Sequence, residues 1–355
     1  MEQFIKDIQI CFNTNTSNNI INFNKLCNKK IKIDLKYLIL YKFLNSFCSN
    51  EKSVETLNNF ISYDRSSFYR QEKQITLEYY EKLNNQISEI CNSHILNKTN
   101  KTKYTFVAVD GTYSTGENYK NSLSMGYFDI TNNIPIEIDL IGPQGKNREY
   151  QELMNKINKD INLFKNKVIV VDRAYFCYKF IHFLITNNIK FIIRCKGDCK
   201  NLKLEKITKD KELIQLIKKS TRIISYTEPI TRTLNLSSGS KKNKSKFSYT
   251  IENKNDCVLI TNLSKHFNNE SILNFYRLRW KVETYFKLVK HNFNFEHLTN
   301  KEEVSIKKQF YCINIISSIC KVFDLYLSKT KKEQNKGIMD DFIIKCNETK
   351  LMRFI

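Results

Sequence analysis

Glycine and proline are scarce in this chain of 355 residues, which contains 8 Gly and 3 Pro, and the first hundred residues contain neither. These residues are the strongest interrupters of regular structure, so their absence favours a helical segment over residues 1–100. Lys, Asn, Ile, Tyr and Phe are abundant instead, which is the profile of a gene with A/T-rich codons. Part of the lysine excess therefore reflects mutational bias.

Clusters of metal-binding Cys and His are also missing. The 11 Cys are scattered and odd in number, which argues against a disulfide framework and favours free thiols in a reducing compartment. Cys195 and Cys199 lie close together, but no second close pair and no His partner accompany them. We therefore expect no zinc site.

The chain lacks the charged-then-apolar pattern of a signal peptide, and no apolar run approaches the length of a membrane span. We therefore expect no membrane partner. The expected location is the cytoplasm, in association with the nucleoid, or the nucleus if the host is eukaryotic.

Acidic residues are few relative to basic ones, because 36 Asp and Glu face 58 Lys and Arg and leave a formal net charge of +22. Such a balance suggests a polyanionic partner, either nucleic acid or an acidic membrane surface. Hydrophobic residues make up 41% of the chain, which is enough for a large core in two or three domains.

The middle of the chain alternates between strand and helix patterns. A meander of three antiparallel strands is predicted over residues 104–109, 122–130 and 134–141. The elements predicted next are a helix over 150–164, a strand over 167–171, a helix over 178–186 and a strand over 190–194.

Residues 196–257 differ in composition, because Lys and polar residues dominate them. Strand-like pieces are short, over 221–226 and 247–251, and residues 237–246 form a flexible basic tract. We interpret this region as an inserted β-rich subdomain. A core strand follows over 257–263, and residues 303–329 form an apolar helix that is expected to pack on the core.

Residues 54–71 fit a short helix, a turn near Ser62 and Tyr63, and a second helix that begins at Asp64 or Ser66. The second helix would present groups suited to phosphates and base edges, namely Ser66, Ser67, Tyr69, Arg70 and Lys73. A helix-turn-helix that binds DNA and an ordinary pair of helices explain this pattern equally well.

The segment Tyr276–Lys290 is predicted to form one helix with two distinct faces. Its apolar face comprises Leu278, Val282, Tyr285, Phe286, Val289 and Phe293. Its polar stripe comprises Tyr276, Arg279, Glu283, Lys287 and Lys290. Either the stripe forms solvent-facing i,i+4 pairs, or Glu283 binds a metal ion while its basic neighbours bind phosphates.

The second interpretation needs further carboxylates, and two aspartates qualify. Asp110 and Asp172 each follow the last apolar residue of a predicted strand, where ligand sites of α/β sheets gather. Together with Glu283 they could hold two Mg²⁺ ions, which prefer oxygen ligands and support phosphodiester chemistry. Alternatively, each aspartate caps the turn that follows its strand.

These residues carry a resemblance to a known family. Two residues separate Tyr276 from Arg279, three separate Arg279 from Glu283, and six separate Glu283 from Lys290. This spacing resembles the Tyr-Arg-Glu-Lys signature of the DDE-type insertion-sequence transposases, and Trp280 beside Arg279 also fits. Asp110-Gly-Thr and Val171-Asp-Arg-Ala-Tyr-Phe are similar to the two aspartate motifs of the family.

The resemblance implies an RNase H-like α/β core, a mixed sheet with flanking helices, in which Asp110, Asp172 and Glu283 hold two Mg²⁺ ions that Mn²⁺ can replace. It implies double-stranded DNA as the partner, both transposon ends and target, bound by a homodimer in a synaptic complex. The residues expected to contact DNA are Tyr276, Arg279, Trp280, Lys287, Lys290 and Arg194.

The resemblance also suggests a division of the chain. We expect a helical N-terminal domain with possible DNA binding, a catalytic core in two parts, a β-rich basic insertion between them and a C-terminal helical region. Their bounds are 1–100, 101–195 with 258–300, 196–257 and 301–355. The expected activity is cleavage of transposon ends and their joining to target DNA; an inactive DNA-binding derivative and an RNase H-like nuclease without strand transfer are the alternatives.

Overall fold

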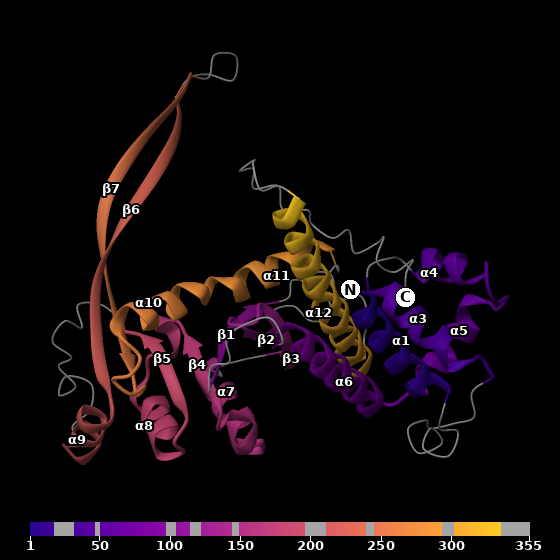
Figure 1. Ribbon diagram of the computed structural model, residues 1–355, viewed down its shortest axis with the longest axis horizontal. Helices are drawn as coiled ribbons and strands as arrows, with labels where there is room; N and C mark the ends of the chain where they lie inside the picture. The colour runs from indigo at the N-terminus through magenta and orange to yellow at the C-terminus, as the bar shows by residue number, and fades with distance from the viewer. Residues whose placement is uncertain are drawn as a thin grey trace. The chain divides into compact units, whose positions relative to one another are not determined.

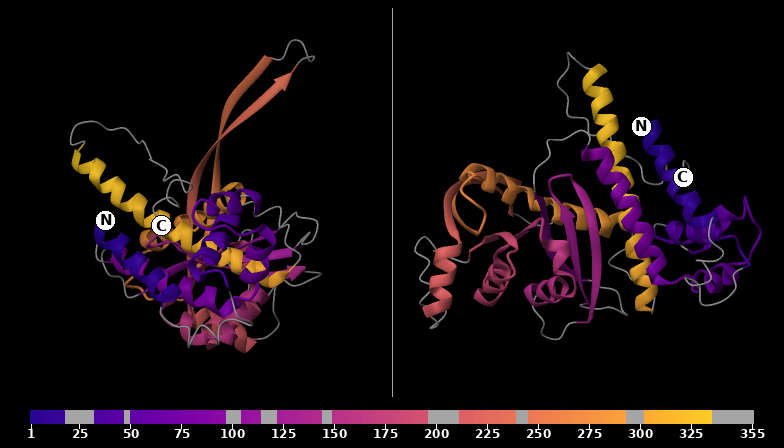
Figure 2. Two further views of the ribbon diagram at one scale, coloured as in Figure 1. Left: turned by 90° about the vertical axis from the view of Figure 1, so that its right-hand side faces the viewer. Right: turned by 60° about the horizontal axis from the view of Figure 1, so that its bottom comes forward.

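The structure is a computed structural model that describes residues 1–17, 32–46, 50–96, 104–113, 122–143, 149–195, 211–238, 245–292 and 302–334. The chain forms two compact units, shown in Figures 1 and 2. The first comprises Met1–Asn147 and Leu278–Ile355, and the second comprises Arg148–Arg277.

The N-terminal part of the first unit is helical, as predicted from its lack of Gly and Pro. Its aspartates start two of the helices: Asp34 accepts a hydrogen bond from the backbone N of Lys36, and Asp64 accepts one from that of Ser67. The helices are α1 (Glu2–Ser17), α3 (Leu35–Asn45), α4 (Asn50–Leu57), α5 (Arg65–Glu72) and α6 (Leu77–Leu96).

Helix α12 (Glu303–Gln334) packs along α6 and also contacts strand β3 and α3, which confirms that the apolar helix joins the core. The expectation that no apolar run reaches membrane-spanning length is wrong for this helix. Residues Glu303–Leu327 are long and apolar enough by length and composition alone. However, 61% of that stretch is buried inside the structure, as in the core helix of a folded unit.

A three-stranded antiparallel meander completes the first unit, in the order β3-β2-β1. Its strands are β1 (Thr105–Tyr113), β2 (Ser122–Asp129) and β3 (Ile134–Pro143). The meander was predicted, but β1 is longer than expected and continues through Asp110, which pairs with Gly126 of β2. Asp110 therefore lies within a strand rather than after its end.

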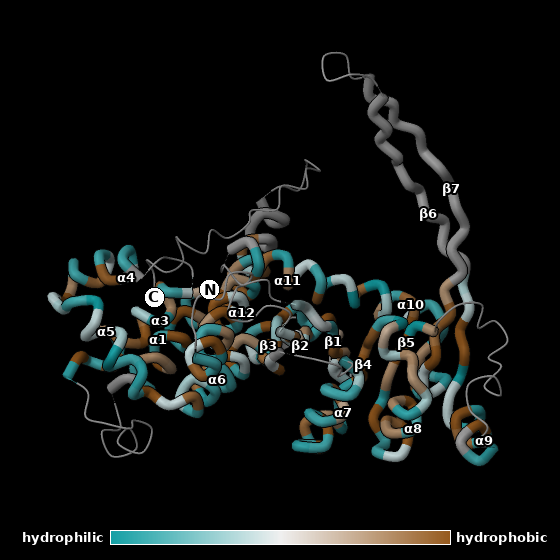
Figure 3. Tube along the Cα trace, turned by 180° about the vertical axis from the view of Figure 1, so that it is seen from behind, coloured by the Kyte–Doolittle hydropathy of each residue, from teal (hydrophilic) through white to brown (hydrophobic). Residues whose placement is uncertain are grey.

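The second unit contains four strands in the order β4-β5-β7-β6. Strands β4 (Lys167–Val171) and β5 (Lys190–Arg194) are parallel, and helix α8 (Tyr178–Thr186) connects them. All three elements have the predicted bounds. Figure 3 colours β4 and β5 mainly as hydrophobic, and residues 168–171 and 191–193 are fully buried. They form the core of this unit.

The helix predicted over 150–164 is in fact two elements. Helix α7 (Glu149–Lys159) ends before Asp160, and a 3-10 turn, η2 (Ile161–Phe164), follows. The carboxylate of Asp160 accepts hydrogen bonds from the backbone N of Asn162 and Leu163, at 3.1 and 3.3 Å. This local capping competes with continuation of the helix and explains the break.

The insertion forms a long hairpin rather than the short strands predicted. Strands β6 (Arg222–Ser238) and β7 (Ser245–Thr261) have 17 residues each and pair along their whole length, after helix α9 (Lys211–Ser220). The backbone ladder between the two strands is continuous from Arg222↔Thr261 to Ser238↔Ser245. Of the tract 237–246, residues 239–244 lie outside the described part of the chain.

The core strand predicted over 257–263 is not a separate strand. Its first residues form the C-terminal part of β7, which ends at Thr261. That end pairs with β5, from Ile192↔Thr261 to Arg194↔Leu259. Helix α10 (Asn269–Leu278) follows in sequence. Taken together, the two units give the chain a mixed α/β fold in which helices flank parallel and antiparallel strands.

Candidate active site

Asp110 lies at the centre of the first unit's site. The apolar residues 106–109 of β1 are buried and fix the strand, so Asp110 follows them at a defined position. Its side chain is 19% exposed, and its Oδ1 accepts a hydrogen bond from the backbone N of Gly111 at 3.0 Å. The carboxylate is thus held within reach of solvent.

The predicted single helix over Tyr276–Lys290 is broken at Arg279. Helix α10 ends at Leu278 and helix α11 (Trp280–Asn292) begins one residue later. The backbone N of Val282 donates to the carbonyl of Arg279 at 3.1 Å, an i−3 bond that tightens the first turn of α11. Arg279 therefore lies in a turn between two helices.

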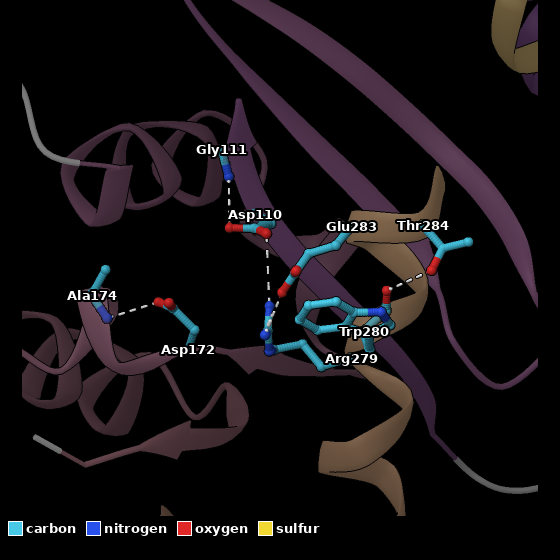
Figure 4. A network of polar contacts seen from close by, with 8 residues as sticks. All are labelled: Asp110, Gly111, Asp172, Ala174, Arg279, Trp280, Glu283 and Thr284. Atoms are coloured by element: carbon cyan, nitrogen blue, oxygen red, sulfur yellow. Dashed lines mark hydrogen bonds and ion pairs between the residues drawn. The ribbon is translucent and has the colours of Figure 1, made fainter. Parts of the chain in front are cut away.

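The turn directs the Arg279 guanidinium to two carboxylates (Figure 4). Its Nη2 lies 2.6 Å from Oε1 of Glu283, and its Nη1 lies 3.7 Å from Oδ2 of Asp110. The Arg279 side chain is 12% exposed and that of Glu283 26%. The predicted pair Arg279–Glu283 is thus confirmed as an ion pair, and Asp110 joins it.

Helix α11 is held on the meander by its apolar face. Val282, Tyr285, Phe286 and Val289 are buried as predicted, whereas Leu278 is partly exposed and Phe293 lies outside the described residues. The hydroxyl of Tyr285 donates to Oδ1 of Asn314 on α12 at 2.6 Å.

A lysine anchors the first turn of α11 to the turn that follows strand β2. Nζ of Lys281 donates to the carbonyl oxygen of Ile130 at 3.1 Å. This bond and the apolar face of α11 together position Glu283 beside β1.

Two of the predicted DNA contacts lie together on the outer side of α11. Trp280 is 56% exposed, and Nζ of Lys287 lies 5.5 Å from the centroid of its ring, within the range of a cation–π interaction. Lys287 is exposed, and Lys290 is partly buried. An exposed aromatic ring next to a lysine is suited to a base or sugar and a phosphate.

The remaining predicted residues belong to the second unit. Asp172 follows β4 directly and caps the 3-10 turn η3 (Arg173–Tyr175): its Oδ1 accepts a hydrogen bond from the backbone N of Ala174 at 2.7 Å (Figure 4). The capping alternative is therefore realised. It does not use up the carboxylate, which has two oxygens and about four lone-pair sites.

Arg194 ends β5, and its side chain is hydrogen-bonded with that of Tyr276. Burial by itself would lower the Arg194 pKa, but neighbouring Cys257 and Tyr276 outweigh it and raise the pKa. Tyr276 is 7% exposed and lies on α10, so it does not continue the exposed stripe of α11. Its contacts with Arg194 position the guanidinium.

The possible helix-turn-helix has the predicted elements, α4 and α5, and α5 begins after Asp64. The hydroxyls of Ser66 and Ser67 donate to the Asp64 carboxylate at 2.5 and 2.6 Å, and Lys73 pairs with Glu302 at 2.5 Å. Arg70 also donates to the backbone oxygen of Ser66 at 3.2 Å, and Nζ of Lys73 lies 4.6 Å from the centroid of the Tyr69 ring. All five groups predicted to contact DNA therefore have partners within the protein. Tyr69 and Arg70 are exposed.

Asp110 and Glu283 fit a divalent cation, because two partly exposed carboxylates already converge on one positive group. Within the described residues, no three His, Cys, Asp or Glu side chains are close enough to hold a metal ion. The guanidinium of Arg279 stands where a cation would otherwise balance the two acids.

Sequence reasoning missed Gly126 and Lys281. Gly126 lies opposite Asp110 in the meander, and a side chain there would collide with Phe286 of α11. An isolated glycine in a strand pattern was the available signal, because it marks a close approach of another element. Lys281 gave no signal, since its partner is a backbone carbonyl.

A mixed α/β scaffold with converging acids, flanked by basic and aromatic side chains, defines a candidate phosphoryl-transfer core. Residues 96–319 match the family model described as the transposase DDE domain, so the chain belongs to this family of DNA transposases. The match confirms the family resemblance and its RNase H-like fold. No curated protein matches the chain.

Proposed function

We propose that this protein is a metal-dependent transposase that cuts at the ends of its own element and joins the freed 3′-hydroxyls to target DNA. The observation that supports this most directly is the convergence of Asp110 and Glu283 on the single cation of Arg279. The family match makes DNA the substrate class, and the net charge of +22 suits a polyanion.

Asp110, Asp172 and Glu283 are the proposed metal ligands, for two Mg²⁺ ions or Mn²⁺ in their place. Bound divalent ions would activate the attacking oxygen and stabilise the leaving oxygen of the phosphodiester. The three carboxylates supply the hard oxygen ligands that such ions require. Asp172 keeps its lone pairs available even while it caps its turn.

The basic residues bind and orient DNA. When a DNA phosphate enters, the Arg279 guanidinium can pair with it, because arginine binds phosphate and carboxylate with the same planar geometry. Lys287, Lys290 and Arg194 add positive charge, and Trp280 offers an exposed ring. We propose that a homodimer brings two ends together.

Two successive displacements complete the proposed reaction. A water oxygen first attacks the phosphorus at the element's end, the 3′ oxygen of the element leaves, and it takes up a proton as a 3′-hydroxyl. That hydroxyl then loses its proton and attacks a target phosphodiester, whose own 3′ oxygen leaves. Each step breaks one P–O bond and forms another, so no covalent enzyme intermediate is needed.

The test is cleavage of a labelled duplex that carries the element's end, taken from inverted repeats in the DNA flanking the gene. Asp110→Asn, Asp172→Asn and Glu283→Gln should each lose Mg²⁺-dependent cleavage and keep end binding, because each removes a metal ligand and little volume. Glu89→Gln, at an exposed site on α6, is the matched control and should cleave normally.

The outcomes separate the alternatives. Cleavage retained in any of the three variants would contradict the proposed triad. A wild-type protein that binds ends and never nicks them, with Mg²⁺ or Mn²⁺, would be an inactive DNA-binding derivative. Nicking without joining in a strand-transfer assay would identify a nuclease.

A further inference from the structure

Gly126 of β2 lies directly opposite Asp110 of β1 in the antiparallel register. Residues directly opposite each other in such a pair project from the same face of the sheet. Helix α11 packs against both strands. The missing side chain of Gly126 therefore leaves space next to the Asp110 carboxylate, beneath the helix that carries Glu283.

The ring of Phe286 fills this space. A methyl group at position 126 would lie 2.5 Å from Cζ of Phe286, 3.0 Å from its Cε1 and 3.2 Å from its Cε2. The first distance is far inside van der Waals contact. The two Cε atoms are at nearly equal distances and Cζ is closest, so the ring points end-on at Gly126.

End-on contact limits how the helix could adapt. Rotation about χ2 leaves Cζ in place, because Cζ lies on the rotation axis. Relief would require a change in χ1 or a displacement of α11. Phe286 is 5% exposed, so another rotamer has little room.

Two residues that precede Phe286 on α11 also hold the helix in place. Lys281 bonds to the carbonyl of Ile130, and Tyr285 bonds to Asn314. Glu283 lies between these anchors, three residues before Phe286 and hence on a neighbouring turn. A shift of α11 away from β2 would carry the Glu283 carboxylate away from Asp110.

We propose that Gly126 is a positioning residue for the candidate metal site: by seating Phe286, it sets the distance at which Glu283 faces Asp110. The inference deepens the proposed function and rests on it, since it concerns the binding of a divalent cation by those two carboxylates. Gly126 acts through Phe286 and touches neither metal nor DNA.

The experiment is a double-mutant series with Gly126→Ala, Phe286→Leu and both together in the full-length chain. Leucine lacks Cζ and both Cε atoms, so it removes the atoms that an alanine would meet. Ser124→Ala, on the same strand face two residues away, is the control. Mn²⁺ affinity is measured by calorimetry without DNA, and the Mg²⁺ requirement of cleavage is measured separately.

Gly126→Ala should weaken Mn²⁺ binding by about tenfold, the lower end of the effect of losing support around a metal ligand. It should also raise the Mg²⁺ concentration for half-maximal cleavage. In the Phe286→Leu background the same substitution should change Mn²⁺ affinity less than twofold, and Ser124→Ala should leave it unchanged. This background keeps the test usable if Gly126→Ala alone fails to fold.

Equal Mn²⁺ affinity in wild type and Gly126→Ala would overturn the positioning role while leaving the proposed function intact. A loss that Phe286→Leu does not rescue would overturn it too, because the effect would then not pass through the ring. A wild type that binds Mn²⁺ but cuts no DNA would refute the proposed activity alone. A wild type that binds no Mn²⁺ would refute both proposals.

Discussion

At the scale of single residues, Arg279 is an internal cation for two acids. Its guanidinium contacts both Glu283 and Asp110, and its side chain is 12% exposed. Two neighbouring carboxylates repel each other unless a positive charge lies between them. The same arginine therefore stabilises the two carboxylates by itself and would compete with a divalent cation for the same oxygens.

We predict that Arg279→Ala binds Mn²⁺ several-fold more tightly than wild type in the absence of DNA, because it removes this competing charge. The same variant should bind transposon ends more weakly. Lys287→Ala is the matched control, since it removes a positive charge from α11 without opening the ion pairs with Asp110 and Glu283. The Mn²⁺ affinity of each variant is measured by calorimetry. Equal affinities for Arg279→Ala and Lys287→Ala would contradict the prediction that Arg279 competes with the cation.

At the scale of elements, the end of β2 anchors the start of α11. Asp129 accepts hydrogen bonds from the backbone N of Thr131 and of Asn132, both at 2.9 Å, and so shapes the turn that presents the Ile130 carbonyl to Lys281. Burial raises the pKa of Asp129, and burial lowers the pKa of Lys281. Both groups are less stable as ions here than in water.

The raised pKa of Asp129 predicts that the stability of the protein depends on pH. Between the ordinary pKa of 3.8 and the raised value, the folded state binds the proton more tightly than the unfolded state. The free energy of unfolding should therefore fall as the pH rises through this window. Asp129→Asn should remove that fall, because it cannot titrate.

Urea unfolding at closely spaced pH values, upward from the ordinary Asp pKa, measures the effect. Asp139→Asn replaces a partly exposed carboxyl on β3 and serves as the control. The prediction fails if wild type and Asp129→Asn lose stability in parallel across the window.

Elements bounded by polar residues were predictable from the sequence. Strands β4 and β5 and helix α8 have the predicted bounds because their apolar runs end where burial ends. The break at Arg279 was not predictable, since no Gly or Pro marks it and the turn is held by contacts with Glu283 and Asp110. The length of the β6–β7 hairpin was missed because backbone pairing, not side-chain pattern, maintains it.

The candidate site was predictable in its parts and not in its assembly. The sequence indicated Asp110 and Glu283 from their neighbours along the chain. It predicted that the two strands pair in a meander but not in which register, so it could not place Gly126 opposite Asp110. The role of Arg279 as a bridge between acids was missed for the same reason, because that role depends on contacts between distant segments.

At the scale of the whole chain, a buried ion pair joins the N-terminal helices to the C-terminal one. Nζ of Lys308 on α12 lies 3.3 Å from Oε1 of Glu72 on α5, although 236 positions separate the two residues. Both side chains are 3% exposed, and the hydroxyl of Tyr80 donates to the same oxygen of Glu72 at 3.2 Å. Burial lowers the pKa of Lys308, and the attraction of Glu72 opposes that effect.

Breaking this pair from one side should cost far more than removing an exposed pair. Lys308→Met leaves Glu72 buried without its cation, so we predict a loss of about 3–5 kcal/mol in the free energy of unfolding. Lys307→Met is the matched control, because Lys307 pairs with Glu303 at 2.7 Å on the more exposed side of the same helix and should cost about 0.5 kcal/mol or less.

The double variant Glu72→Leu/Lys308→Met should recover much of the loss, since neither member of the pair is then left buried without the other. Chemical denaturation of the three variants and the wild type gives the comparison. A loss for Lys308→Met no larger than that for Lys307→Met would show that the buried pair does not hold α5 to α12. The junction would then depend on the apolar residues of α12, such as Phe310 and Ile313, which are buried in the same unit.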